Sequence, residues 1–432
     1  MRVLVLGGYG LIGLEIVRRL RADGLDVTGL GRSAAKGRRA APDVDWIGAD
    51  IATLTTPESW RAHLAGIDAV VNASGALQDG LRDNLAAVQD EAIRALIGAC
   101  AEYGVHRFVQ ISAPGADAAG ETAFMRTKGV ADDALKASAL RWTIFKPGLV
   151  ISANAYGGTQ LLRMLAAFPV VQPLVLGDAR IQTVAADDVA DAVSFALMHE
   201  QTTVHRTFDL VERGSHRLRD VVAAFRAWLG IVAAKRRLEL PAAFGFAIAH
   251  LADLAGWLGW RSPLRTTALR VLARDVAGDA STWEAVRGRA LKSLDETLRA
   301  LPATLQERVS ARAGLVFPAL VMTLSAFWLA SSLIGLWQTD AAARVLGGAV
   351  TPAMAMTLVF VGSALDLCIG AGLLVRRFTR AAARASIVVS LGYLASGTWL
   401  TPHLWADPLG PFVKIFPAMA LALAVAALAE ER

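Results

Sequence analysis

The chain has 432 residues, enough for two or three domains, and 54% of them are hydrophobic. The two cysteines, Cys100 and Cys368, lie in segments of different character, so no disulfide framework is expected. The formal net charge of +6 does not indicate a nucleic-acid-binding protein, because the arginines are scattered or lie beside apolar runs.

Short apolar strands alternate with helices through the first part of the chain. Strands are predicted at 3–6, 26–30, 44–47, 68–71, 107–111, 142–145 and 207–211. Helices are predicted at 11–20, 82–103, 124–136, 187–199 and 218–229, and residues 241–301 are predicted to be helical. Because strands that alternate with helices are typical of a doubly wound parallel sheet, we predict an α/β domain of the Rossmann type over residues 1–300.

The C-terminal part of the chain contains four apolar segments, each near the length needed to cross a bilayer. They cover residues 314–337, 352–375, 385–400 and 411–428, and the third is the shortest. A buried helical core would normally keep polar residues along one side of each helix, whereas residues 314–337 carry no charge. We therefore predict an all-α four-helix transmembrane bundle over residues 313–432.

Basic residues predict how these helices cross the membrane. Four arginines lie between the second and third segments, in residues 376–384, and Arg308 and Arg312 precede the first segment. The two other loops contain only Arg344. The positive-inside rule therefore places the first domain, the arginine loop and the C-terminus in the cytoplasm. We expect a multi-pass protein of the cell (inner) membrane.

The strongest local motif lies directly after the first predicted strand. Its residues are Gly7, Gly8, Tyr9, Gly10, Leu11, Ile12 and Gly13. Because a helix follows, a pyrophosphate at this point would meet free backbone N–H groups and the positive end of the helix dipole. Side chains would block its approach, which explains the glycines. A tight turn without a ligand is the alternative, but the complete strand–turn–helix context favours a dinucleotide site.

The end of the second strand indicates which dinucleotide binds. An NAD site usually has an acidic residue here, which holds the ribose 2′-hydroxyl. This chain has Arg32 and Ser33 instead, and a guanidinium suits a 2′-phosphate. The sequence thus favours NADP(H), with NAD(H) as the alternative if Arg32 only belongs to a solvated basic loop.

Further motifs follow the glycine loop in a fixed order. They are Asp50-Ile51, Asn72-Ala73-Ser74-Gly75, Ser112 at the end of a strand, Lys146-Pro147-Gly148 and Asp187-Asp188. As a set they resemble the extended and atypical short-chain dehydrogenases, and they are most similar to the branch with the nucleotide-binding accessory subunit of respiratory complex I. The resemblance implies that Asp50 and Ile51 lie at the adenine, that residues 72–75, Ser112 and Pro147 line the cofactor, and that Ser112 also assists catalysis.

The chain departs from this family at the proton donor. The family uses Tyr-x-x-x-Lys, in which the lysine lowers the pKa of the tyrosine. Here the two positions are Phe124 and Lys128. The resemblance implies that Lys128 binds the nicotinamide ribose, but Phe124 has no proton to give, and Tyr156 is the one candidate to replace it. Tyrosine-dependent carbonyl reduction is therefore not expected.

The membrane half has a motif of its own. Residues 407–414 resemble the Pro-Leu-Gly…Lys entry to the last helix of the DoxX-like four-helix proteins. Asp366 and Lys414 are ionisable groups in apolar segments, where charge is costly. A substrate or proton role and a structural hydrogen bond would each explain Asp366. The histidines lack metal-ligand spacing, so no metal is expected.

Together these features predict a membrane-anchored NAD(P)H-binding oxidoreductase that acts on a lipophilic small molecule such as a quinone, an isoprenoid or a lipid. The alternative is a non-catalytic NADP(H)-binding or assembly protein with a membrane protein as its partner, which Phe124 favours. A third interpretation gives the bundle itself a redox role that involves Asp366. The expected surroundings are the lipid bilayer, and no nucleic acid is expected to bind.

Overall fold

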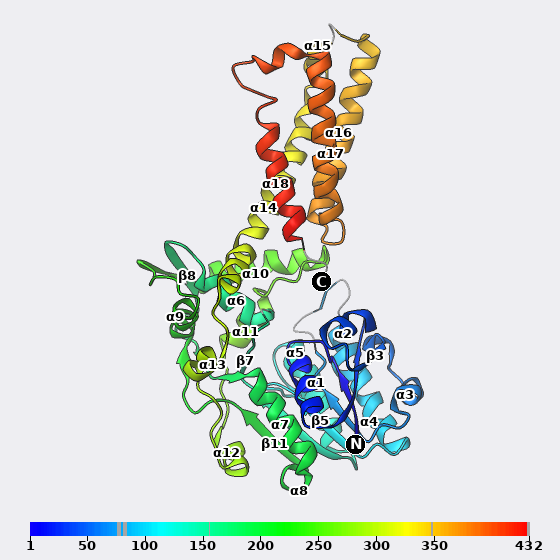
Figure 1. The fold of residues 1–432 in the computed structure, drawn as a ribbon, viewed down its shortest axis with the longest axis vertical. Helices are drawn as coiled ribbons and strands as arrows, with labels where there is room; N and C mark the ends of the chain where they lie inside the picture. The colour runs from blue at the N-terminus through cyan, green and yellow to red at the C-terminus, as the bar shows by residue number, and fades with distance from the viewer. Residues whose placement is uncertain (76–78, 81–83, 155, 347–348, 430–432) are drawn as a thin grey trace. The chain divides into compact units, whose positions relative to one another are not determined.

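The computed structural model describes residues 1–75, 79–80, 84–154, 156–346 and 349–429. The chain forms two compact units, and Figure 1 shows its course through both. The first unit contains Met1–Leu254 and Ser262–Ala311. The second contains Ala255–Arg261 and Arg312–Arg432.

A seven-stranded parallel sheet forms the centre of the first unit. Its strands are β1 (Arg2–Leu6), β2 (Asp26–Gly31), β3 (Asp45–Gly48), β4 (Ala69–Asn72), β5 (Arg107–Ile111), β6 (Arg141–Pro147) and β11 (Arg206–Leu210). Their order across the sheet is β11-β6-β5-β4-β1-β2-β3. Because the chain reverses direction across the sheet between β1 and β4, the carboxyl ends of these two strands form the switch point where such sheets bind ligands. The predicted doubly wound α/β fold is confirmed.

Helices cover both faces of this sheet (Figure 1). They include α1 (Gly13–Ala22), α2 (Ala34–Ala40), α3 (Pro57–Leu64), α4 (Ala92–Glu102), α5 (Ala123–Lys136) and α7 (Ala186–Met198). Val3 and Val5 of β1 join a core with α1 and α7, whereas Leu4 and Leu6 join the opposite core with α3, α4 and α5. Successive strand side chains point to opposite faces, so a run of four fully buried apolar residues requires helices on both sides.

The helix predicted at 82–103 is divided in the structure. Within the described part of this segment, helix begins at residue 85, passes through a π-helical turn, η2 (Ala87–Glu91), and continues as α4. Residues 82 and 83 lie outside the described residues. The sequence does not reveal the widened turn because it changes the helical register without changing the composition.

Several short elements after residue 148 are absent from the sequence prediction. The strands are β7 (Leu149–Ile151), β8 (Val171–Val175), β9 (Arg180–Ile181), β10 (Thr183–Ala185), β12 (His216–Arg217) and β13 (Arg236–Leu240), and the helices are α6 (Gly157–Ala166) and α8 (Glu200–Thr203). Strands of two to five residues are too short to show a repeating pattern. The helix α9 (Leu218–Trp228) agrees with its predicted position.

The predicted helical stretch at 241–301 is not continuous. It contains α10 (Ala242–Trp257), α11 (Thr266–Leu272), α12 (Ser281–Arg287) and α13 (Leu294–Ala300). Between them, Gly259, Asp275 and Gly288 have φ angles of +87°, +60° and +67°. A right-handed helix cannot continue through such a backbone conformation, so the stretch is interrupted.

The second unit is helical. Its elements are α14 (Leu305–Trp337), which begins in the first unit, α15 (Thr339–Leu346), α16 (Pro352–Leu374), α17 (Thr379–Leu400), the 3-10 turn η3 (Pro402–Trp405) and α18 (Ile415–Leu428). α17 lies between α16 and α18 and contacts both (Figure 1). By length and composition, α14 and α16 are able to cross a membrane, and α18 is a shorter apolar helix. The predicted region of apolar helices is confirmed.

The outer surfaces of these helices are apolar. Met322, Phe360, Val388 and Leu423, one from each of four helices, are each at least 50% exposed. A bilayer would cover side chains of this kind, whereas water would leave a large unfavourable apolar surface.

The last apolar segment begins later than predicted. Residues 411–414 form turns, and α18 starts at Ile415. Lys414 is therefore an exposed residue directly before the helix, near the start of the predicted apolar segment. The short helix α15 was also not predicted from the sequence.

Candidate functional site

The glycine loop closes tightly between β1 and α1. Gly7 has φ +67°, and a Cβ atom added there would stand 2.8 Å from the carbonyl oxygen of Ala73. The Gly10 N–H donates to the Gly7 carbonyl at 2.8 Å, and a Cβ at Gly13 would stand 2.2 Å from that same oxygen. The turn therefore has no room for side chains at Gly7 and Gly13, and it brings backbone close to the point where a pyrophosphate would approach.

The start of α1 suits an anion. Ile12 precedes the helix and supplies no side-chain cap. The first N–H groups of a helix need a partner from outside, and the helix dipole favours a negative one. The Leu14 N–H already donates to the Gly10 carbonyl at 3.1 Å, so the other N–H groups at this end are the ones open to an anion. The space that Cβ atoms at Gly7 and Gly13 would fill lies beside this helix start, where no side chain caps the helix, and it fits the pyrophosphate of a dinucleotide.

Tyr9 connects the glycine loop to the end of β2. A Cβ atom at Gly31 would stand 2.4 Å from ring atom Cε1 of Tyr9. The Tyr9 hydroxyl accepts a hydrogen bond from the Ser33 N–H at 3.2 Å. The Ser33 hydroxyl in turn accepts from the Lys36 N–H at 3.3 Å and caps α2. Arg32 is exposed between these residues, so the predicted phosphate-binding segment directly adjoins the loop.

Asp50 and Ile51 follow β3. The Ala49 N–H donates to the carbonyl of Gly31 at 3.0 Å, which brings this segment to the end of β2. Asp50 is exposed, and its Oδ1 accepts from the Ala52 N–H at 3.2 Å as the cap of the 3-10 turn η1 (Ile51–Thr53). Ile51 is buried in the core. Their proposed contact with adenine stays a prediction.

Residues 72–75 are held by hydrogen bonds among themselves and to β5. The Asn72 side chain donates to Gln110 Oε1 at 2.9 Å and accepts at Oδ1 from the Ser74 hydroxyl and N–H at 2.5 and 3.0 Å. Asn72 is 1% exposed. These polar side chains therefore fix the shape of the segment, while Ala73 presents its backbone to Gly7.

Lys128 lies beside this segment and is buried. Its Nζ donates to the carbonyl of Ile111 at 2.7 Å and to that of Ser74 at 3.5 Å, and a Cβ at Gly75 would stand 3.5 Å from it. Burial lowers the pKa of Lys128 to about 8, and the charge of Asp132 opposes this shift. The predicted residues Ser74, Gly75 and Lys128 thus come together at the carboxyl ends of β4 and β5.

Asp132 is a site residue that the sequence interpretation missed. It lies one helical turn after Lys128 on α5 and is 1% exposed. The Ser112 hydroxyl is hydrogen-bonded to Asp132 Oδ2, whereas Oδ1 has no partner among the described residues. Burial raises the pKa of the Asp132 carboxyl, and the bond to Ser112 and the charge of Lys128 oppose this shift. The spacing Lys128-x-x-x-Asp132 places both residues on one helix face, but only the packing of α5 against β5 shows that this carboxyl is buried beside Ser112.

The remaining predicted residues lie further along the chain. Pro147 is buried at the end of β6, where it pairs with Leu210 of β11. Tyr156 directly precedes α6 and is 46% exposed. Within the described part of the chain, its hydroxyl makes no hydrogen bond to Ser112. Its role as a substitute acid stays a prediction. Phe124, four residues before Lys128, is half-buried.

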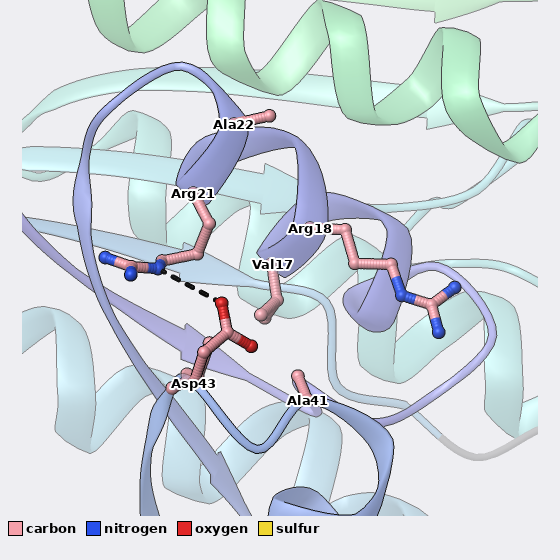
Figure 2. A pocket seen from close by; sticks show the side chains of 7 residues that line it. Val17, Arg18, Arg21, Ala22, Ala41 and Asp43 are labelled. Atoms are coloured by element: carbon pink, nitrogen blue, oxygen red, sulfur yellow. Dashed lines mark ion pairs between the residues drawn. The ribbon is translucent and has the colours of Figure 1, made fainter.

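The first unit also has a surface hollow of about 290 Å³. Its lining includes Arg18 and Arg21 of α1 and Asp43 before β3, and Arg21 and Asp43 form an exposed ion pair at 3.8 Å (Figure 2). None of the predicted cofactor residues lines this hollow. An exposed pair of this kind contributes little energy, and we assign the hollow no function.

The second unit contains a polar group of its own, built around Asp366 of α16. Asp366 is 4% exposed, and its two oxygens accept from the Ser331 hydroxyl at 2.6 Å and the Tyr393 hydroxyl at 2.8 Å. These bonds join α14, α16 and α17 through side chains. These bonds agree with a structural role for Asp366, and a substrate or proton role stays a prediction. No group of three or more potential metal ligands occurs among the residues that the structure describes.

Comparisons with known proteins address both units. Residues 7–200 match the family described as NAD(P)H-binding, and residues 325–423 match the DoxX-like family. The photosystem II assembly factor Ycf39 of Cyanophora paradoxa is 27% identical over 323 residues, which cover 72% of this chain and 92% of that protein. The NAD(P)H azoreductase of Xenophilus azovorans is 30% identical over 196 residues, 45% of this chain and 63% of the azoreductase.

Solved structures share the fold of the first unit. The Bordetella bronchiseptica enzyme WbmG in complex with NAD superposes with a TM-score of 0.54 at 17% identity, over 72% of this chain and 95% of WbmG. WbmH from the same organism, in complex with NAD+, gives a TM-score of 0.53 at 16% identity, over 69% and 96%. The chain therefore combines a Rossmann-type α/β unit, part of which matches the NAD(P)H-binding family, with an apolar helical unit, part of which matches the DoxX-like family.

We predict that Gly13→Ala weakens NADPH binding by about tenfold or more, because the added Cβ would collide with the Gly7 carbonyl and force the loop open. Isothermal titration calorimetry of the full-length protein measures this. Gly98→Ala is the matched control, since Gly98 is an exposed residue of α4 whose added Cβ would meet nothing closer than Pro57 Cγ at 3.5 Å. Equal affinities in all three proteins would contradict the assigned cradle.

Proposed function

We propose that the protein is a membrane-anchored, NADP(H)-dependent oxidoreductase that acts on a lipophilic substrate such as a quinone, an isoprenoid or a lipid. One observation carries this proposal: a single chain contains both a dinucleotide cradle and apolar helices long enough to cross a bilayer. A tethered enzyme meets a membrane-dissolved substrate at high local concentration. The name of the similar NAD(P)H azoreductase supports reduction with this kind of cofactor.

In this proposal, different residues of the first unit bind different parts of the cofactor. Gly7 and Gly13 keep the pyrophosphate position clear, and Arg32 offers a guanidinium to the 2′-phosphate. Lys128 is held by the carbonyls of Ile111 and Ser74, and we assign it the role of a donor to the nicotinamide ribose. When bound, NADPH supplies a hydride. The chain itself has to position the substrate and provide a proton.

A second candidate is a non-catalytic NADP(H)-binding protein that assembles or stabilises a membrane protein complex. Phe124 at the position of the family's tyrosine favours it. The similarity to Ycf39, which is named as a photosystem II assembly factor, favours it as well. In this case the dinucleotide would hold the first unit in its folded form, and the partner would be a membrane protein.

We predict that NADPH binds more tightly than NADH and that Arg32→Ala removes most of this preference. The loss of a charge-assisted phosphate contact costs roughly 1.5–3 kcal/mol. Calorimetry with both cofactors on the native protein, on Arg32→Ala and on Arg61→Ala checks this, with Arg61 as an exposed arginine of α3. Equal affinities for the two cofactors, or an unchanged ratio in Arg32→Ala, would show that NADP(H) is not preferred.

We predict that the full-length protein in lipid vesicles oxidises NADPH when a short-chain quinone is added, and that Gly13→Ala reduces the rate in step with its cofactor affinity. The absorbance of NADPH follows the reaction. A lipid ketone and an isoprenoid aldehyde serve as further acceptors. Tight NADPH binding without oxidation by any of these acceptors would overturn the enzymatic proposal and favour the assembly protein.

We also propose that the first unit and the C-terminus lie in the cytoplasm. Arg376 and Arg377 connect α16 to α17, and Arg380 and Arg384 belong to the first turns of α17. The loop is held in place within the second unit, because the Arg376 N–H donates to the Leu258 carbonyl at 2.9 Å. Such a concentration of arginine supports a cytoplasmic position for this end of the bundle.

Reporter fusions test the orientation. We predict that a reporter after Arg432 and one inserted between Arg376 and Arg384 read as cytoplasmic, whereas one beside Asp340 in α15 reads as external. An external C-terminal reporter would mean that the chain crosses the membrane an odd number of times.

A further inference from the structure

We propose that Asp132 supplies the proton that the absent tyrosine would have delivered, and that it does so through the hydroxyl of Ser112. The proposal rests on the proposed function, since it concerns a substrate oxygen that gains negative charge as a hydride arrives. The substrate class is a carbonyl compound or a quinone. Ser112 is then the catalytic residue that touches the substrate, and Asp132 is a positioning and proton-supplying residue that acts through it.

The surroundings of Asp132 favour its neutral form. The side chain is 1% exposed, and its hydrogen-bond partner within the described chain is the Ser112 hydroxyl, at Oδ2. Oδ1 is buried without a partner. An ionised carboxylate has two acceptor oxygens with about four lone-pair sites to satisfy, and leaving one oxygen bare in the interior is costly. A neutral acid needs fewer partners, so this position suits a protonated carboxyl.

The direction of the hydrogen bonds follows from this protonation. With Asp132 ionised, the Ser112 hydroxyl donates to Oδ2. When Asp132 is neutral and its proton lies on Oδ2, the carboxyl donates to Ser112 Oγ instead, so the serine proton is left for a third atom. Asp132 is the hydrogen-bond partner recorded for the Ser112 hydroxyl within the described residues. The third atom is therefore proposed to be the substrate oxygen. Ser112 alone would be a poor acid. When it is hydrogen-bonded to a neutral Asp132, it gives its own proton to the substrate oxygen and receives the proton of Asp132.

Lys128 stabilises the negative charge that Asp132 carries after it has given up its proton. It lies one turn before Asp132 on α5, and its Nζ is anchored on the Ile111 carbonyl at 2.7 Å. It therefore does not compete for Ser112, while its charge acts on Asp132. Lys136 on the same helix and Lys146 on β6 are the other charged groups that act on this carboxyl. All three cations favour the carboxylate once its proton has gone.

The step balances with the reduced nicotinamide as the source of electrons. The hydride and its electron pair pass to the substrate, and a substrate carbon–oxygen double bond is reduced. The proton of the Ser112 hydroxyl moves to the substrate oxygen, and the proton of Asp132 moves to Ser112 Oγ. Asp132 is left as a carboxylate, and solvent returns its proton before the next turnover. A quinone becomes a hydroquinone by the same count of one hydride and one proton.

Infrared spectroscopy tests the protonation without any turnover. The full-length native protein should show a carboxylic acid C=O band at neutral pH, and Asp132→Asn should lose part of it. Asp133→Asn is the matched control, because Asp133 is the next residue of α5 but is exposed and pairs with Lys136 at 3.1 Å. Asp366 is present in every variant, so its contribution cancels in the difference. A band that is unchanged in Asp132→Asn would overturn the proposal.

Kinetics with NADPH and a short-chain quinone test the relay itself. Asp132→Asn and Ser112→Ala should each lower kcat by about 100- to 10,000-fold, and Asp132→Asn should leave NADPH affinity unchanged, whereas Asp133→Asn should behave like the native protein. Because the relay needs the protonated acid, the native rate should fall as pH rises through the pKa of Asp132, and Asp132→Asn should lose this fall. If the native protein turns over quinone and Asp132→Asn does so at the same rate, the relay is wrong but the proposed function stands. If the native protein shows no turnover, the proposed function is wrong, and so is the relay.

Discussion

The close approach of Gly7 to the backbone of Ala73 is the contact on which the first unit depends. It joins the ends of β1 and β4, the two neighbouring strands at which the sheet changes direction. A side chain at Gly7 would push these strand ends apart, because its Cβ would stand 2.8 Å from the Ala73 carbonyl oxygen and 2.9 Å from Ser74 Cα. The glycine loop, the segment after β4 and the start of α1 all meet beside this contact.

Burial determines which hydrogen bonds and protonation states the polar side chains near this contact adopt. At the carboxyl ends of β4 and β5, Asn72, Ser112 and Lys128 are each less than 10% exposed. Every polar atom there either finds a partner within the protein or raises the free energy of the folded state. Most of these side chains therefore bond to one another or to backbone carbonyls. The few atoms left without partners, such as Oδ1 of Asp132, are the ones whose protonation the fold influences most.

The sheet was predictable because its strands are hydrophobic runs with helices between them, and those runs leave a clear pattern in the sequence. Strands such as β9, with two residues, leave no pattern, and their position depends on tertiary contacts. The same limit applies to the site. The glycine loop is local, so its residues were found together, whereas Ser112 and Asp132 meet only after β5 and α5 have packed. Whether Asp132 faces water or the core cannot be read from its spacing alone.

The π-helical turn at Ala87–Glu91 has a consequence for how this protein tolerates change. A widened turn holds one residue more than an ordinary turn, so it offsets the part of the helix before it from the part that follows. Gln89 lies in this turn, accepts a hydrogen bond from Thr127 at 3.2 Å and stands close to Gly75. α4, which follows the turn, packs in the core. A single-residue insertion or deletion in the turn would therefore act first on the direction in which Gln89 faces the cofactor segment and only then on the packing of α4.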